Sequence, residues 1–125
     1  MPIRYIKLGE RGCWEADCIQ QGTLRLGYES PHHMDAVEGN WDAVREFWLQ
    51  HYNGNQATAT SAVRQIRDFY EAPEQHLWVT FYQGLLWWCH AGAEVTELED
   101  GTKIRMAIGG WRSENEAGEP LAMAS

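Results

Sequence analysis

The chain has 125 residues, of which 44% are hydrophobic, and its formal net charge at pH 7 is −8. This length fits one domain with a single core, and the ordinary composition excludes a disordered or fibrous chain. Seven tryptophans are an unusual number for a domain of this size. They indicate either a core of large rings or a pocket for a flat ligand, because an indole combines a wide apolar surface with a polar edge.

The charge is distributed unevenly along the chain. Residues 1–70 carry seven basic and nine acidic residues, a net of −2, whereas residues 71–125 carry three basic and nine acidic residues, a net of −6. Binding to a polyanion through charge alone requires many Lys and Arg side chains. The balance therefore argues against non-specific nucleic-acid binding, and contacts to phosphates are expected mainly from the first half.

The chain shows no sign of membrane insertion or export. No apolar run approaches the ~20 residues of a membrane span, and the opening MPIRYIKLGE lacks the hydrophobic stretch of a signal peptide. We therefore expect a cytoplasmic protein without membrane contact. Cys13, Cys18 and Cys89 agree with this, because an odd number of cysteines without framework spacing is typical of reduced thiols that fill apolar space.

The first half of the chain predicts strands and helices in alternation. Short alternating runs rich in strand formers predict strands, and apolar residues at intervals of three and four predict helices. Glycine and proline mark the boundaries between these segments. In chain order we expect a strand over Arg4–Leu8, a turn over Gly9–Gly12, a helix over Trp14–Gln21, a strand over Thr23–Tyr28, a loop over 29–39, and helices over Trp41–Tyr52 and Ala57–Tyr70.

The second half predicts antiparallel strands. We expect a hairpin of His76–Tyr82 and Leu85–Ala91 around Gln83-Gly84, a strand over Glu94–Leu98, and a strand over Lys103–Ile108 that ends at Gly109-Gly110-Trp111. This order of elements predicts an α+β domain, with a small curved sheet or open β-barrel flanked by helices. The domain spans 1–125, and 113–125 is expected to be a tail or a linker to an effector domain.

No group of residues indicates catalysis. His32 and His33 are adjacent on a loop and point apart, and the spacings HxxxH and HxH are absent, so no metal site is expected. Cys89 and His90 would face opposite sides of a strand, which separates a nucleophile from its base. The chain also lacks a P-loop and a GxGxxG motif. We therefore expect neither enzyme activity nor a cofactor.

The positions of the tryptophans divide them into two groups. Trp48, Trp78 and Trp87 are predicted to fill the core. Trp14, Trp41 and Trp111 stand at the ends of predicted elements, where rings line the mouth of a small barrel, and Trp88 faces the opposite side of its strand from Trp87. Such a mouth suits a planar group held between rings, and a nucleobase is the commonest group of this kind.

Three segments together resemble a known family. They are RYIKLGERGCWEADCIQQGTLRLGY, LWVTFYQGLLWWCHA and IRMAIGGWRSENEAGEPL. They are similar to the N-terminal reader module of bacterial modification-dependent restriction endonucleases, which belongs to the PUA-like superfamily with the YTH and EVE domains. The resemblance covers nearly the whole chain and implies a PUA-like barrel. It also implies that nuclease chemistry lies in a separate downstream domain, often of HNH type.

The resemblance implies a function as a reader of modified bases. YTH-type domains hold N6-methyladenine in a tryptophan cage, and EVE-type domains hold 5-methylcytosine or 5-hydroxymethylcytosine. Where YTH domains carry one cage tryptophan, this chain offers Tyr28, so Trp14 or Trp41 would supply the missing ring. The predicted base-binding residues are Trp14, Tyr28, Trp41, Trp88 and Trp111, and the residues predicted to contact the DNA backbone are Arg4, Lys7, Arg25 and Arg112.

The expected partner is double-stranded DNA that carries a methylated base, together with a fused or separate nuclease. Two alternatives stay open. The chain is alternatively a protein-interaction or small-ligand domain that uses the same aromatic pocket, and its acidic second half favours a basic protein partner. A PUA-like RNA-binding module is the other alternative, and it differs from the first hypothesis only in substrate.

Overall fold

The computed structural model describes residues 2–114 and residue 119, and within them the fold is mixed α+β. The strands are β1 (Ile3–Tyr5), β2 (Thr23–Leu26), β3 (Leu77–Tyr82), β4 (Leu85–His90), β5 (Thr96–Glu97) and β6 (Lys103–Met106). The helices are the 3-10 helix η1 (Glu10–Gly12) and the α-helices α1 (Glu15–Gln21), α2 (His33–Glu38), α3 (Trp41–His51) and α4 (Gln56–Glu71). The predicted α+β class is confirmed.

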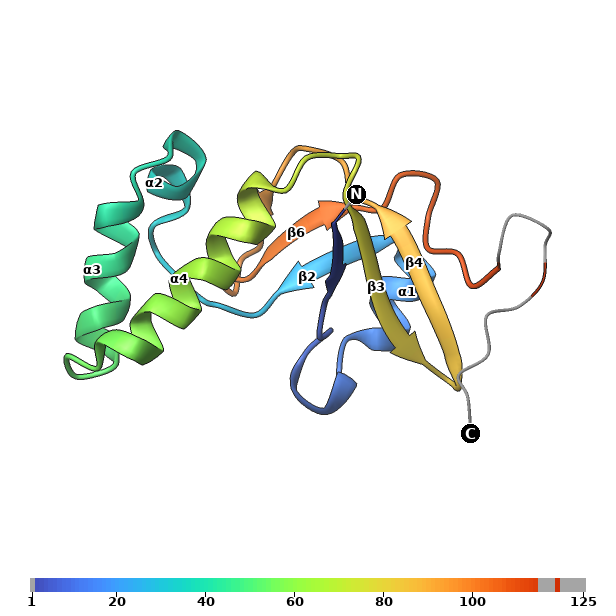
Figure 1. Ribbon diagram of the computed structural model, residues 1–125, viewed down its shortest axis with the longest axis horizontal. Coiled ribbons are helices and arrows are strands. Elements are labelled where there is room, and N and C mark those ends of the chain that lie inside the picture. The colour runs from blue at the N-terminus through green and yellow to red at the C-terminus, as the bar shows by residue number, and fades with distance from the viewer. Residues whose placement is uncertain (1, 115–118, 120–125) are drawn as a thin grey trace.

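The first sheet, called sheet A, has the strand order β1-β3-β4 (Figure 1). β1 is parallel to β3, with Ile3 opposite Leu77, and β3 forms an antiparallel hairpin with β4. The predicted hairpin is therefore confirmed. Its two-residue turn is Gln83-Gly84, where φ is 51° and 74°. Positive φ at both positions matches the right-handed twist of the strands, as hairpin turns of this length require.

The second sheet, called sheet B, has the strand order β2-β6-β5. The two sheets meet at one end, where Ala91 pairs with Ala107 and the amide of Ile108 donates to the carbonyl of His90 at 2.7 Å. Away from this joint, sheet A ends in the edge strand β1 and sheet B ends in the edge strand β2. The described strands thus form a bent pair of sheets and no closed barrel.

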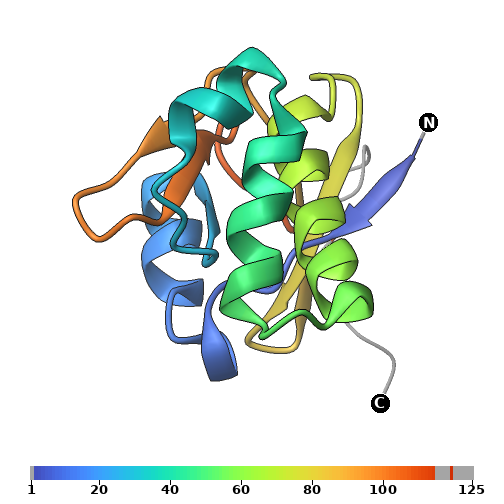
Figure 2. The same ribbon diagram turned by 90° about the vertical axis from the view of Figure 1, so that its left-hand side faces the viewer.

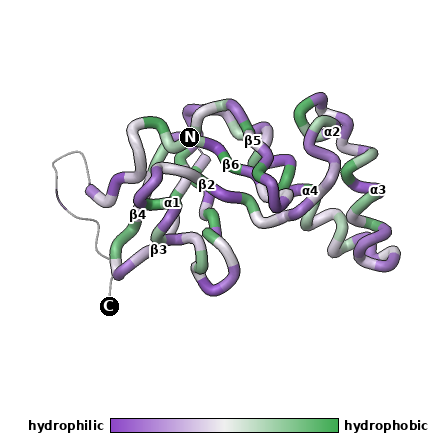
Figure 3. Tube along the Cα trace, turned by 180° about the vertical axis from the view of Figure 1, so that it is seen from behind, coloured by the Kyte–Doolittle hydropathy of each residue, from purple (hydrophilic) through white to green (hydrophobic). Residues whose placement is uncertain are grey.

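The helices α2, α3 and α4 form a layer at one end of the molecule (Figure 2). The side chains that α3 and α4 bury follow helical spacing, as the sequence predicts. The amide of Thr58 donates to the side chain of Asn55, which caps α4 at 3.1 Å. At the other end α1 lies beside β2 (Figure 3). None of the described helices combines the length and the apolar character needed to cross a bilayer.

The segment 29–39 differs from its prediction as a loop, because it contains the six-residue helix α2. A helix of six residues is too short for a hydrophobic period to show in the sequence. It ends at Gly39, where φ is 80°, the left-handed conformation that glycine adopts at low cost. Before it, Nδ1 of His32 lies 2.8 Å from a carboxylate oxygen of Asp35, and this hydrogen bond lowers the pKa of Asp35.

The central strand of sheet B, β6, has an inverted burial pattern. Lys103 and Arg105 are 2% and 1% exposed, whereas Met106 and Ile108 are 55% and 52% exposed. Burial of a cation is costly unless hydrogen bonds replace the water that it loses. The partners of the two cations therefore decide whether this strand can be stable.

Arg105 obtains those partners from backbone carbonyls. Its Nε donates to Gly92, its Nη1 donates to Phe69 at 3.0 Å and to Ala72 at 2.8 Å, and its Nη2 donates to Ala91 at 3.2 Å. Phe69 and Ala72 belong to the end of α4, where carbonyls lack partners within the helix. One guanidinium thus joins the end of α4 to the chain that follows β4.

We expect Arg105→Met to lower the free energy of unfolding by about 3 kcal/mol, because it leaves several buried carbonyls without donors. Urea unfolding followed by circular dichroism measures this change. Arg64→Met on the exposed side of α4 is the matched control and should change the free energy by less than about 0.5 kcal/mol. Equal effects of the two substitutions would contradict this role of Arg105.

Candidate functional site

A cavity of about 700 Å³ opens between the edge strands of the two sheets. Its wall includes residues 4–7, which begin in β1, residues 25–28, which begin in β2, and part of α4. The aromatic residues of the wall are Tyr5, Trp14, Tyr28, Phe69 and Trp78. The volume lies within the usual range for small-ligand sites, and an aromatic wall with a few polar groups is typical of them.

Trp14 lies against two glycines, at the start of α1. A Cβ atom on Gly27 would lie 3.3 Å from the far edge of the indole, and one on Gly9 would lie 3.0 Å from the ring and 2.5 Å from Sγ of Cys13. Gly9 also has a φ of 85°, which side-chain-bearing residues rarely adopt. The two glycines therefore make room for the indole and restrict its position in the wall.

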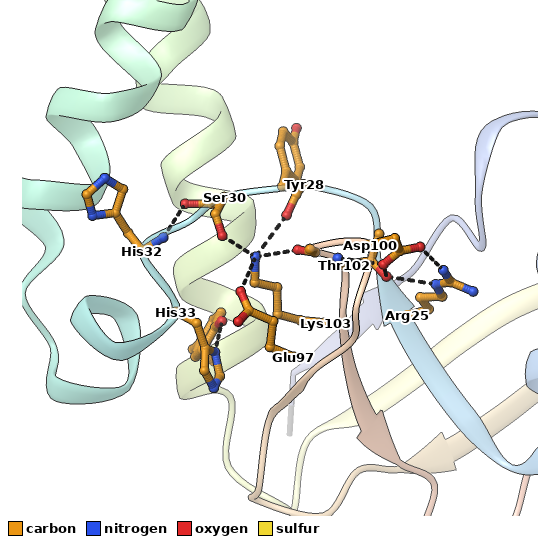
Figure 4. Close-up of polar contacts among 11 residues, drawn as sticks. Arg25, Tyr28, Ser30, His32, His33, Glu97, Asp100, Thr102 and Lys103 are labelled. Carbon is orange, nitrogen blue, oxygen red and sulfur yellow. Dashed lines mark hydrogen bonds and ion pairs between the residues drawn. The ribbon is translucent and has the colours of Figure 1, made fainter.

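Arg25 covers the same ring. Its guanidinium carbon lies 4.1 Å from the centroid of Trp14, within the range of a cation–π contact. Arg25 is itself held by Asp100, which accepts from Nη2, and by Thr102, which accepts from Nε at 3.0 Å (Figure 4). Hydrogen bonds from Thr102, together with the charge of Arg25, lower the pKa of Asp100. The stacked pair of Arg25 and Trp14 thus has contacts at both residues: Asp100 and Thr102 hold Arg25, and Gly9 and Gly27 lie against Trp14.

Tyr28 is placed through its backbone by the buried ammonium of Lys103. Nζ of Lys103 donates to the carbonyls of Tyr28 at 3.4 Å, Ser30 at 2.7 Å and Gly101, and lies 3.7 Å from the carboxylate of Glu97 (Figure 4). Burial lowers the pKa of Lys103, and Glu97 opposes this shift. Burial also raises the pKa of Tyr28. The phenol therefore enters the wall as a neutral ring.

Trp78 forms the inner part of the wall and is 4% exposed. The ring of Phe69 meets it edge to face at 6.0 Å, and the guanidinium of Arg4 lies 6.0 Å from its centroid. Its indole Nε1 is buried and has no hydrogen-bond partner among the described residues. A buried donor without a partner costs about 1–3 kcal/mol, which a water or a ligand acceptor can offset.

The cavity also carries charged residues of both signs. Arg4 forms an ion pair with Asp68 at 3.0 Å and donates from Nε to Nδ1 of His76 at 3.2 Å. Nδ1 of His76 is the acceptor in this contact, and burial together with the charge of Arg4 lowers the pKa of His76. Lys7 and Glu10 are exposed parts of the wall. Of the residues predicted to contact DNA, Arg4, Lys7 and Arg25 therefore meet at one cavity.

Trp41 does not belong to this wall. It stands at the start of α3, where its Nε1 donates to Glu71 at 3.0 Å and its ring contacts Tyr70 edge to face at 5.9 Å. The guanidinium of Arg67 lies 5.7 Å from its centroid. Trp41 thus packs the start of α3 against the end of α4. Its position at a helix start predicted a base-binding ring and did not reveal this packing role.

Trp88 and Trp111 also lie outside the wall. Trp111 is a core residue, 8% exposed, and its Nε1 donates to the carbonyl of Thr23 at 2.8 Å. Trp88 is half-buried on β4, its Nε1 donates to the carbonyl of Glu114 at 2.8 Å, and the exposed Arg112 lies 5.7 Å from its centroid. Of the five predicted base-binding residues, the structure therefore places Trp14 and Tyr28 in the cavity wall. Trp78, which was not predicted to bind the base, is a further ring of the same wall.

The histidines near α2 make local contacts. Nδ1 of His33 lies 2.7 Å from the hydroxyl of Tyr70, and burial raises the pKa of that phenol. Nδ1 of His32 contacts Asp35 instead. The described residues hold no group of three or more His, Cys, Asp or Glu side chains arranged to bind a metal ion.

Comparison with known proteins gives no relative: the chain matches no protein-family model, no curated protein and no solved structure. The geometry of the cavity is therefore the basis for any functional conclusion.

The three thiols should differ sharply in reactivity. Cys13 is exposed in the cavity wall, whereas burial raises the pKa of Cys18 and raises that of Cys89 to about 12. Only thiolates react readily, so iodoacetamide at about pH 8 should modify the folded protein first at Cys13. Peptide mass spectrometry locates the modified residue, and Cys13→Ser is the control. Equally rapid modification of Cys89 would contradict the described packing.

Proposed function

We propose that the cavity between β1 and β2 binds a methylated nucleobase of DNA, either N6-methyladenine or 5-methylcytosine with its hydroxymethyl form. The observation that carries this proposal is the cavity itself, where five aromatic residues and three basic residues meet in a chain of net charge −8. A ring stacked on a base contributes about 1–3 kcal/mol. Stacking and burial of the methyl group would together supply the affinity.

Preorganisation of Trp14 supports the proposal. Gly9, Gly27 and Arg25 restrict the indole before any ligand arrives. Ordering a side chain during binding costs about 0.5–1.5 kcal/mol, and a ring that is already fixed avoids this cost. Beside it, the buried ring of Trp78 forms the inner part of the wall, and its Nε1 has no partner among the described residues.

We further propose that the fold is a PUA-like barrel that is open at this cavity. The joint of Ala91 with Ala107 connects the sheets on one side, and the edge strands β1 and β2 border the cavity on the other. An opening between two edge strands gives a flat ligand direct access to side chains that point inward. In this proposal the seam of the barrel is the binding site.

The charges around the cavity favour recognition of the base over attraction to phosphates. Arg4 is paired with Asp68 and Arg25 with Asp100, so much of their charge is compensated within the protein. A module of this kind binds unmodified DNA weakly, and we propose that it directs a nuclease domain or partner to modified sites. The proposal assigns no catalytic step to this chain.

Trp14→Ala should weaken binding to the methylated oligonucleotide by at least about tenfold, because it removes one stacking ring. The measurement is fluorescence anisotropy with oligonucleotides that carry N6-methyladenine, 5-methylcytosine, 5-hydroxymethylcytosine or no modification. Trp41→Ala is the matched control because Trp41 lies outside the cavity wall and packs between α3 and α4, and it should change the affinity by about twofold or less. Thermal unfolding of both variants checks that they are folded.

Equal affinity of the unmutated chain for all modified and unmodified DNA would contradict the proposal. Modified RNA oligonucleotides in the same assay would reveal the RNA-binding alternative. Binding to no nucleic acid would contradict both readings and would favour the small-ligand or protein-interaction alternative.

The salt dependence of binding gives a separate test. For DNA, the slope of log K against log salt is about −0.9 for each phosphate that the protein neutralises. Three basic residues line the cavity and two of them are paired with carboxylates, so we expect a slope no steeper than about −3. Affinity measured over a series of NaCl concentrations gives this slope. A much steeper slope would show that phosphates dominate binding.

A further inference from the structure

The outer face of sheet A carries exposed aromatic residues that the cavity does not explain. Tyr5 on β1 is 60% exposed and Phe81 on β3 is 43% exposed, and their ring centroids lie 5.9 Å apart. In Figure 1, β3 and β4 lie in front, and no described helix covers them from that side. Two adjacent exposed rings on an uncovered sheet face are a candidate contact surface.

Tyr5 connects this face to the cavity. It belongs to the cavity wall and yet exposes most of its surface, so it lies at the rim. The other exposed apolar residue of β1, Ile3, is not part of the wall. Phe81 supports the ring of Tyr5 from the neighbouring strand. The pair therefore forms a small aromatic ridge beside the entrance.

The strands that carry the ridge are poor in negative charge. The segments 2–9 and 75–93, which include all of sheet A, contain Arg4 and Lys7 and no aspartate or glutamate. Acidic residues from other segments do reach the cavity wall, namely Glu10 and Asp68, and Asp68 is paired with Arg4. In contrast, a second hollow beside sheet B is bordered by Glu29, Glu97, Glu99 and Asp100. DNA would therefore meet less repulsion at the β1 side of the cavity than at sheet B.

Removal of a base from a duplex leaves an apolar gap between its neighbours, and the loss of stacking costs a few kcal/mol. Proteins that open base steps often offset this cost by inserting an apolar side chain. We propose that Tyr5, supported by Phe81, enters the gap left by the flipped base, so that the site takes its base from double-stranded DNA. This inference rests on the proposed function of the cavity.

Other exposed apolar residues are less suited to this role. Met34 and Val37 lie on α2, and Met106 and Ile108 lie on or just after β6, and none of them contributes to the cavity wall. Trp88 on the outer face of sheet A is half-buried, and its Nε1 is already bonded to Glu114. Tyr5 is the one exposed ring within the wall, among the residues that the structure describes.

The test compares Tyr5→Ala with the unmutated chain on duplex and single-stranded oligonucleotides that carry the same methylated base. We expect Tyr5→Ala to weaken duplex binding by about tenfold, the loss of one base–ring stack, and to change single-strand binding by about twofold or less. Tyr5→Phe keeps the ring and should keep the duplex affinity. Ile108→Ala, a similarly exposed residue outside the cavity wall, is the control and should affect neither substrate.

Other outcomes separate this inference from the proposed function. Equal losses on duplex and single strand would show that Tyr5 is only a wall of the base site, and would overturn the inference. No loss with Tyr5→Ala, or binding of the unmutated chain to single strands alone, would overturn it as well. Failure of the unmutated chain to distinguish methylated from unmethylated DNA would instead contradict the proposed function.

Discussion

Arg105 donates from the centre of sheet B to carbonyls at the end of α4 and in the chain that follows β4. These connections fix sheet A, sheet B and α4 relative to one another, and the same three parts border the cavity. Two residues earlier on the same face of β6, Lys103 holds the backbone of Tyr28 and Ser30. Both cations lose water on burial, and the carbonyls replace it. The shape of the cavity therefore depends on a polar core within β6.

The net charge of the sequence does not show how many basic residues are available to bind a ligand. Two of the three basic residues in the acidic second half stabilise the interior, and Arg4 and Arg25 are paired with carboxylates at the cavity. Among the described residues of the cavity wall, Lys7 is then the one cation that is not paired with a carboxylate. Under the proposed function, this compensation would weaken binding to ordinary DNA, and the contacts inside the cavity would decide the affinity for a modified base.

Local patterns in the sequence predicted most of the elements but not how they are assembled. The helical spacing of apolar residues in α3 and α4 and the turn at Gln83-Gly84 were sufficient to predict these elements, because each signal depends only on residues close in sequence. Helix α2 was missed since six residues carry no period. The buried face of β6 could not be predicted, because the carbonyls that accept from Arg105 come from segments 13 to 36 residues away.

The same limit applies to the candidate site. Trp14 and Tyr28 were predicted to bind the base, and both line the cavity. Trp41 and Trp111 were also predicted to bind it, but their indoles contact Glu71 and Thr23 outside the wall. Trp78 was predicted as core, and it is both buried and part of the wall.

The most direct test is a titration of the ¹⁵N-labelled protein with a methylated oligonucleotide, followed through its tryptophan indole N–H signals. We predict that the signals of Trp14 and Trp78 shift while that of Trp41 does not. A shift confined to Trp41 would contradict a base site between β1 and β2.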